Sequence, residues 1–198
     1  SDPFHTSIGG DNPDESRFPE NYGIEKWMTN RARRAVELYG SDESITHDEF
    51  FRYKYDKLYS EKSNLRRQVA DFVEAQAGNS VLKKEIDLLR QWNGETTKDN
   101  RSTALVLLTF RPRSNSSKRK TGHERTLEQL QKASENLVKH FARIDVKWGK
   151  VNRLVRGDKN LPLGGGPDTL RAIYGRPQED GTLAGQAGDC FFQFVEWD

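Results

Sequence analysis

The sequence predicts an α+β fold, in which a mainly helical segment is followed by β-strands towards the C-terminal end. Apolar residues in 24–146 recur at the spacing of one helix face. Residues 147–198 instead contain short β-prone pieces separated by glycine and proline. Residues 1–23 are rich in proline, glycine, asparagine and aspartate, which predicts an extended arm without regular structure.

The composition argues against several functional classes. Hydrophobic residues make up 33% of the 198 residues and charged residues 31%, which implies a small apolar core and an extensive polar surface. The 32 basic and 30 acidic residues leave a net charge of +2, so no overall field favours nucleic acid or an anionic membrane. No apolar run approaches the roughly 20 residues of a membrane-spanning helix. The single cysteine, Cys190, excludes an internal disulfide.

Four helices are expected in the first half of the chain, over residues 24–39, 46–59, 64–77 and 80–94. Thr46 followed by Glu49 has the pattern of a capping box, and Ser63 is placed to cap the third helix. Glycines are expected to end the first, third and fourth helices, at Gly40, Gly78 and Gly94. The side chains expected to face inward are Ile24, Trp27, Met28, Ala32, Ala35, Val36, Tyr39, Leu65, Val69, Phe72, Val73, Leu82, Ile86, Leu89 and Trp92.

The second half mixes helix and strand signals. The run STALVLLTF at 102–110 allows a buried helix or a strand, and its Leu and Ala content favours the helix. A basic loop at 111–123 precedes a long amphipathic helix over 124–143, whose inward residues are expected to be Leu127, Leu130, Leu137, Val138 and Phe141. Strands are expected at 150–157 and 189–197, whereas 169–175 fits either type.

The glycine loop at 164–166 is a candidate phosphate site, because glycines let backbone N–H groups converge on an anion. The surrounding LPLGGGPDT contains neither the Lys-Ser/Thr pair of a P-loop nor a G-x-G-x-x-G pattern, so a tight connection between elements is favoured. The four histidines have no partner at metal-ligand spacing, and no metal or cofactor is predicted. Ser1 could act as a terminal nucleophile, but Asp2-Pro3 follows it in a loop, which favours a cut chain end.

Three stretches match a known family pattern. They are NPDESRFPENYGIEKWMTNRARRAVELYG at 12–40, WGKVNRLVRGDKNLPLGGGPDTLRAIYG at 148–175, and AGDCFFQFVEWD at 187–198. With these motifs the chain resembles the large subunit of the penicillin acylase family, particularly the acyl-homoserine-lactone and aculeacin-type acylases, in the C-terminal part of that subunit. The helix containing SITHDEFFRYKYD is similar to a family helix of the same period. One departure is Cys190, where the family usually has serine.

The resemblance implies an N-terminal-nucleophile hydrolase with a four-layer α/β/β/α core. The parent would be a periplasmic precursor that cuts itself into two subunits and hydrolyses an amide through a serine acyl-enzyme. Its substrates would be acylated amines such as acyl-homoserine lactones or penicillins, with neither nucleic acid nor membrane as a partner. The nucleophilic serine and the oxyanion asparagine are expected upstream of this chain. The 198 residues are therefore expected to be one incomplete domain, inactive alone, that associates with the rest of the large subunit and with the small subunit.

The resemblance assigns one candidate site residue. TNRARRA at 29–35 is similar to the family segment that bears an arginine orienting the oxyanion asparagine, and the match falls on Arg31. A guanidinium with five donors is suited to hold an amide oxygen and backbone carbonyls near a reacting centre. The alternative is an ordinary arginine on the surface of an amphipathic helix. Arg33 and Arg34 are expected to be solvated.

Two other functional classes are open on the residues alone. A helical protein-interaction module would use the aromatic face formed by Phe50, Phe51 and Tyr53. An RNA-binding module would use the basic loop with Lys118, Arg119 and Lys120. That loop contains no aromatic residue for base stacking, so a solvated loop is favoured there.

Overall fold

The structure is a computed structural model that describes residues 28–40, 42–110, 122–188 and 195. The predictions for the arm at 1–23, for Ile24 and Trp27 at the start of the first helix, for most of the basic loop and for most of the last strand lie outside these residues. Within the described part, seven helices accompany a four-stranded mixed sheet, in agreement with the α+β class. The helices are α1 (Asn30–Tyr39), α2 (His47–Lys54), α3 (Asn64–Ala75), α4 (Lys83–Arg90), α5 (Thr103–Phe110), α6 (His123–Phe141) and α7 (Trp148–Val151).

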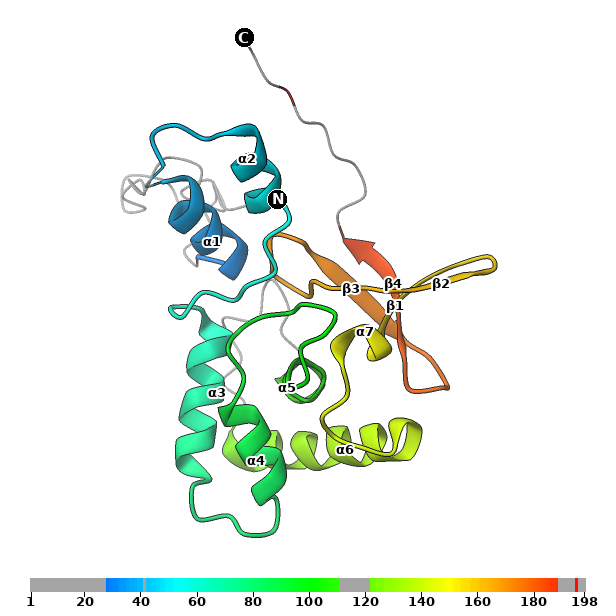
Figure 1. Cartoon of the computed structure of the whole chain (residues 1–198). Coiled ribbons are helices and arrows are strands. Elements are labelled where there is room, and N and C mark those ends of the chain that lie inside the picture. The colour runs from blue at the N-terminus through cyan, green and yellow to red at the C-terminus, as the bar shows by residue number, and fades with distance from the viewer. Residues whose placement is uncertain (1–27, 41, 111–121, 189–194, 196–198) are drawn as a thin grey trace, which may run out of the picture.

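The arrangement of the elements is shown in Figure 1. Helices α3 to α6 lie together, the sheet lies beside α7, and the pair α1 and α2 lies apart from the α3–α6 group. Figure 1 also shows the hairpin of β1 and β2 projecting from the body of the protein. Among the described residues, none of the helices combines the length and apolar character that crossing a membrane requires.

The core centres on α5, which packs against α3, α4, α6 and α7. Six of its eight residues are buried, because TALVLLTF is apolar on all sides. The ambiguous run at 102–110 therefore forms a helix, as its Leu and Ala content predicted. Helix α3 turns its predicted face inward, since Leu65, Val69, Phe72 and Val73 are all buried. Helix α6 contributes Leu130 and Leu137, both 0% exposed.

The sheet has the strand order β2-β1-β4-β3. Its strands are β1 (Asn152–Arg156), β2 (Lys159–Pro162), β3 (Ile173–Pro177) and β4 (Leu183–Gly188). Strands β1 and β4 are parallel, whereas β1–β2 and β3–β4 are antiparallel. The glycine loop connects β2 to β3, so it runs from the edge of the sheet back towards the helices. The undecided segment at 169–175 is a strand only in its last three residues, which begin β3.

The caps of two helices are confirmed. Thr46 and Glu49 make the complete capping box at the start of α2. Ser63 caps α3, and its side chain accepts from the backbone N–H of Arg66 at 3.2 Å. Short polar side chains near a helix start thus gave correct starting points, because capping is a local interaction.

Several predicted ends are wrong. The first helix begins at Asn30 because Thr29 is an extended N-cap, and α2 ends at Lys54 because the chain then runs to a bridge between Leu58 and Glu95. Helices α3 and α4 end before their expected glycines. Helix α4 also starts later than expected, because the side chain of Asn79 accepts from the N–H groups of residues 81 and 82 in a local turn.

Two further predictions need correction. Val138 is 50% exposed rather than inward, because it lies one residue, and so about 100°, around α6 from the buried Leu137. The strand expected at 150–157 starts at Asn152, since Lys150 and Val151 belong to the short helix α7.

Candidate functional site

The predicted site residue Arg31 lies in the first turn of α1. Thr29 caps this helix, because its Oγ1 accepts a hydrogen bond from the backbone N–H of Ala32 at 3.1 Å. Arg31 is partly buried, and its Nε atom is shielded from solvent. This burial differs from that of a fully solvated surface arginine. Its role near a reacting centre stays a prediction.

Asn30, the residue before Arg31, is almost completely buried at 4% exposed. Its side-chain amide donates to the carbonyl oxygens of Leu58 at 3.2 Å and of Asp168 at 2.8 Å. Its Oδ1 atom accepts from the backbone N–H of Ser60 at 2.8 Å. One amide therefore joins three segments of the chain, and its buried donors and acceptor are satisfied.

Asp168 completes this junction from the glycine loop. Its Oδ2 accepts from the backbone N–H of Asn30 at 2.9 Å, and its Oδ1 from that of Arg31 at 3.4 Å. These N–H groups belong to the first turn of α1, where backbone donors lack partners within the helix. A carboxylate at this end is also favoured by the helix dipole. Asp168 thus binds the turn that carries Arg31.

The glycine loop is fixed from several sides. The backbone N–H of Gly165 donates to the carbonyl of Thr96 at 2.8 Å, and that of Gly166 donates to Oγ1 of Thr169 at 3.2 Å. These two N–H groups are therefore engaged within the protein and do not form an anion cradle. The hydroxyl of Tyr59 donates to the carbonyl of Pro167. Burial raises the pKa of Tyr59 well above its usual value, which keeps this hydroxyl a proton donor.

A charged network lies on the next turn of α1. The Nε and Nη2 atoms of Arg34 donate to the two carboxylate oxygens of Asp56, each at 3.0 Å, and Nη1 donates to Glu37 at 2.7 Å. The Arg34 side chain is 13% exposed, so the expectation that it is solvated is wrong. The hydrogen bond with Asp56 raises the pKa of Arg34 despite burial. Burial alone would raise the pKa of Glu37, but hydrogen bonds from Ser60 and Arg34 lower it.

The family model for penicillin amidase matches residues 8–198. The chain belongs to the penicillin amidase family. This confirms the resemblance seen in the sequence and places the chain, at the level of the family, with acylase-type hydrolases. A comparison with curated proteins found no match.

In this member of the penicillin amidase family, the sequence predicted only some of the residues that hold the first two turns of α1. Arg31 was singled out, whereas Asn30, Asp56 and Asp168 were missed. Asp56 and Asp168 act on residues far away in the sequence, so no local spacing points to their partners. Thr29 was also missed, although a threonine directly before a helical pattern is a usable capping signal.

Within the described residues, the histidines and the aromatic residues singled out in the sequence do not form a second site, and Lys118, Arg119 and Lys120 lie outside those residues. Among the described residues, no group of three or more His, Cys, Asp and Glu side chains could hold a metal ion. The aromatic face of α2 is partly used inside the protein. Tyr53 is buried against Tyr39 with ring centroids 5.2 Å apart, and its hydroxyl donates to Asp42 at 2.7 Å. Phe50 and Phe51 are half-buried.

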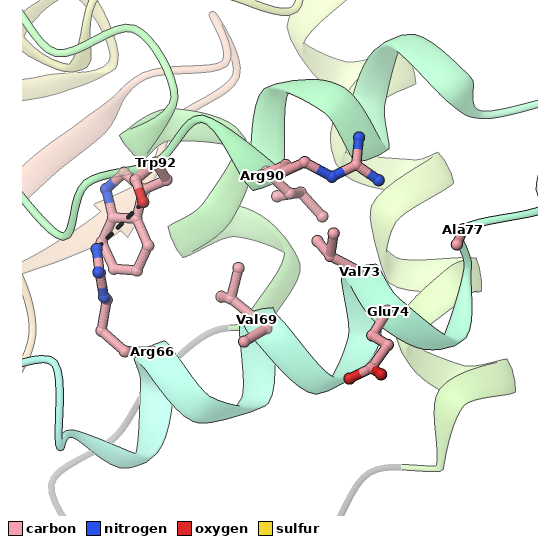
Figure 2. A pocket seen from close by; sticks show the side chains of 9 residues that line it. Arg66, Val69, Val73, Glu74, Ala77, Arg90 and Trp92 are labelled. Atoms are coloured by element: carbon pink, nitrogen blue, oxygen red, sulfur yellow. Dashed lines mark hydrogen bonds between the residues drawn. The ribbon is translucent and has the colours of Figure 1, made fainter.

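A cleft of about 370 Å³ lies between α3 and α4. Figure 2 shows Val69 and Val73 pointing into it from α3, and Arg66 reaching the carbonyl oxygen of Trp92 at one end, over 3.1 Å. The ionisable residues of its lining are Arg66, Glu74 and Arg90. This lining offers an apolar floor with charged edges, and it contains neither a serine nor a histidine for acyl transfer.

Proposed function

We propose that this chain is the scaffold part of the large subunit of an N-terminal-nucleophile acylase. The parent hydrolyses an amide between an acyl chain and an amine through a serine acyl-enzyme, on a four-layer α/β/β/α core. Family membership over residues 8–198 supports this proposal. A mixed sheet with helices beside it is compatible with one half of such a layered core.

In this proposal the reactive serine and the oxyanion asparagine come from segments of the parent other than these 198 residues. The chain alone is then inactive, and its partners are the rest of the large subunit and the small subunit. By family resemblance the substrates are acyl-homoserine lactones, penicillins or related acylated amines, and the enzyme works in the periplasm.

The observation that carries the site assignment is the placement of Arg31 in the first turn of α1, with a partly buried side chain. The backbone N–H of Arg31 is held by Asp168, and its Nε lies in the protein interior. A guanidinium held in one orientation can support an oxyanion-binding amide through hydrogen bonds that need no rearrangement during the reaction. Arg31 therefore acts as a supporting residue for the tetrahedral intermediate.

The test compares this chain with the processed parent enzyme, using a chromogenic acyl anilide and an acyl-homoserine lactone. We expect no burst of released amine from the chain alone and steady turnover from the parent. In the parent, Arg31→Ala should lower kcat by up to about 100-fold, the lower end of the loss that follows removal of an oxyanion donor, because the oxyanion asparagine loses its support. Arg125→Ala, an exposed arginine on α6, is the matched control and should leave kcat unchanged. Turnover by the chain alone, or full activity of Arg31→Ala, contradicts the proposal.

A further inference from the structure

Asp168 has a backbone conformation that few residues other than glycine adopt. Its φ is +61°, in the left-handed region, and it follows directly on the glycine loop through Pro167. Asp and Asn are the non-glycine residues that enter this region most readily, because their short polar side chains bond locally. Here the side chain of Asp168 also accepts hydrogen bonds from α1, 137 and 138 residues away.

The first turn of α1 is shared between two capping residues. Thr29 accepts two hydrogen bonds of 3.1 Å each, from the N–H of Ala32 with its side chain and from the N–H of Arg33 with its carbonyl. Asp168 accepts from the other two backbone N–H groups of this turn, those of Asn30 and Arg31. Thr29 is a local cap that moves with the helix. Asp168 belongs to another part of the fold, so its two bonds fix where the turn lies relative to the glycine loop.

The loop that carries Asp168 is itself held in place. Pro167 accepts from Tyr59, which is 1% exposed, and Gly165 accepts from the indole of Trp148 at 2.7 Å. The carbonyl of Asp168 also accepts from the buried side chain of Asn30 at 2.8 Å. A continuous set of buried and partly buried hydrogen bonds therefore runs from the helical core, through the loop, to the backbone of Arg31.

We infer that Asp168 is a positioning residue, which fixes Arg31 for catalysis by holding the first turn of α1 against the glycine loop. The inference rests on the proposed supporting role of Arg31. Asp168 acts on the reaction only through Arg31, so it contacts neither substrate nor the reacting atoms. Loss of its carboxylate leaves α1 folded on the Thr29 cap but lets the Arg31 guanidinium occupy more than one position.

The test uses the processed parent enzyme with two substitutions at this position. Asp168→Asn keeps the shape and the tolerance of a positive φ but replaces one acceptor oxygen with a donor. Asp168→Gly removes the side chain without steric cost at this φ. Each is combined with Arg31→Ala in a double-mutant cycle. Thr29→Ala is the matched control, because it removes a cap of the same helix without touching the bonds to Asp168.

We expect Asp168→Asn to lower kcat about 10-fold and Asp168→Gly more, with KM unchanged in both. In the Arg31→Ala background neither substitution should lower kcat further. Thr29→Ala should lower Tm but leave kcat near that of the wild type. Hydrogen exchange at the Arg31 amide should accelerate in the Asp168 variants, a readout that also serves if Asp168→Gly assembles poorly.

Three results overturn the inference. The first is a full kcat in Asp168→Asn and Asp168→Gly while Arg31→Ala is impaired, which leaves the proposed function intact. The second is a kcat loss that persists in the Arg31→Ala background, which shows that Asp168 does not act through Arg31. The third is full activity of Arg31→Ala itself, which removes the proposed role of Arg31 and the inference together.

Discussion

The indole Nε1 of Trp148 donates a hydrogen bond to the carbonyl oxygen of Gly165 at 2.7 Å. Trp148 is 2% exposed and belongs to the core formed by the helices, whereas Gly165 lies in the loop that leads to β3. This bond ties the helical region to the glycine loop, close in sequence to Asp168. The position of the candidate site therefore depends on a tryptophan that does not belong to it.

Trp148→Phe should destabilise the protein by about 2 to 4 kcal/mol, because it leaves a buried carbonyl unpaired and a small cavity beside it. The free energy of unfolding, measured with urea, checks this expectation. Val81→Ala is the control, since Val81 is 88% exposed and its truncation should change stability by less than about 0.5 kcal/mol. Equal stability of Trp148→Phe and the wild type would show that the hydrogen bond from Trp148 to Gly165 contributes nothing measurable to the free energy of unfolding.

Gly165→Ala should be more damaging than Gly157→Ala. Both glycines have positive φ, +87° and +55°, so alanine is strained at either position. A Cβ at Gly165 would also overlap the backbone carbonyl of Arg171, whereas a Cβ at Gly157 would meet nothing within 4 Å. We expect a loss of about 1 kcal/mol at Gly157 and at least about 3 kcal/mol at Gly165. Similar midpoints of thermal unfolding for the two variants would refute the close approach of loop and backbone.

Local signals in the sequence predicted much of the helical part. The capping box at Thr46, the cap at Ser63 and the uniformly apolar run of α5 each depend on residues within one helix, so spacing and composition were sufficient. Strands β2 and β4 were not predicted. Their sequences, KNLP and LAGQAG, contain few β-forming residues, and they are strands because they pair with β1 and β3.

The candidate site was predictable only as far as a family motif reaches. Arg31 falls within TNRARRA, but nothing near Asp168 indicates that its carboxylate binds α1. The same holds for Asp56, whose partner Arg34 was expected to be solvated. Contacts of this kind depend on how the finished fold brings distant segments together, which helical periodicity does not encode.

Leu105→Ala should cost about 2 to 5 kcal/mol in the free energy of unfolding, because the side chain is 0% exposed at the centre of α5 and its removal leaves a cavity. Val138→Ala in α6 is the matched control. Val138 is 50% exposed, so its truncation should cost less than about 0.5 kcal/mol. A large loss of stability in Val138→Ala would indicate that Val138 faces inward, as the sequence predicted, and would contradict the observed orientation of α6.

The Arg34–Asp56 pair should not tolerate replacement of the arginine by lysine. Arg34→Lys keeps the charge but cannot make the two parallel bonds to the carboxylate, so we expect a loss of about 1 to 3 kcal/mol. Arg52→Lys is the control, because the Arg52 side chain is 66% exposed and its pair with Glu49 is a surface contact. Chemical denaturation of both variants gives the comparison. If Arg34→Lys is no less stable than Arg52→Lys, the bidentate geometry contributes nothing measurable.

Asp99 should give the chain a pH-dependent contribution to stability at strongly acidic pH. Hydrogen bonds from Lys98 at 2.5 Å and from Lys147 at 2.9 Å lower the pKa of Asp99 from 3.8 to about 2. Because the folded pKa is depressed, the contribution is complete above the unfolded value of 3.8 and is lost as the pH falls towards 2.

Asp99→Asn should therefore be less stable than the wild type near neutral pH, and the stabilities of the two proteins should converge as the pH falls through this window. The carboxyl ¹³C shift of Asp99 measures its pKa directly, and added salt should reduce the difference because the group is exposed. A carboxyl that titrates near 3.8, or a stability difference that is independent of pH, would show that the two lysines do not act on it.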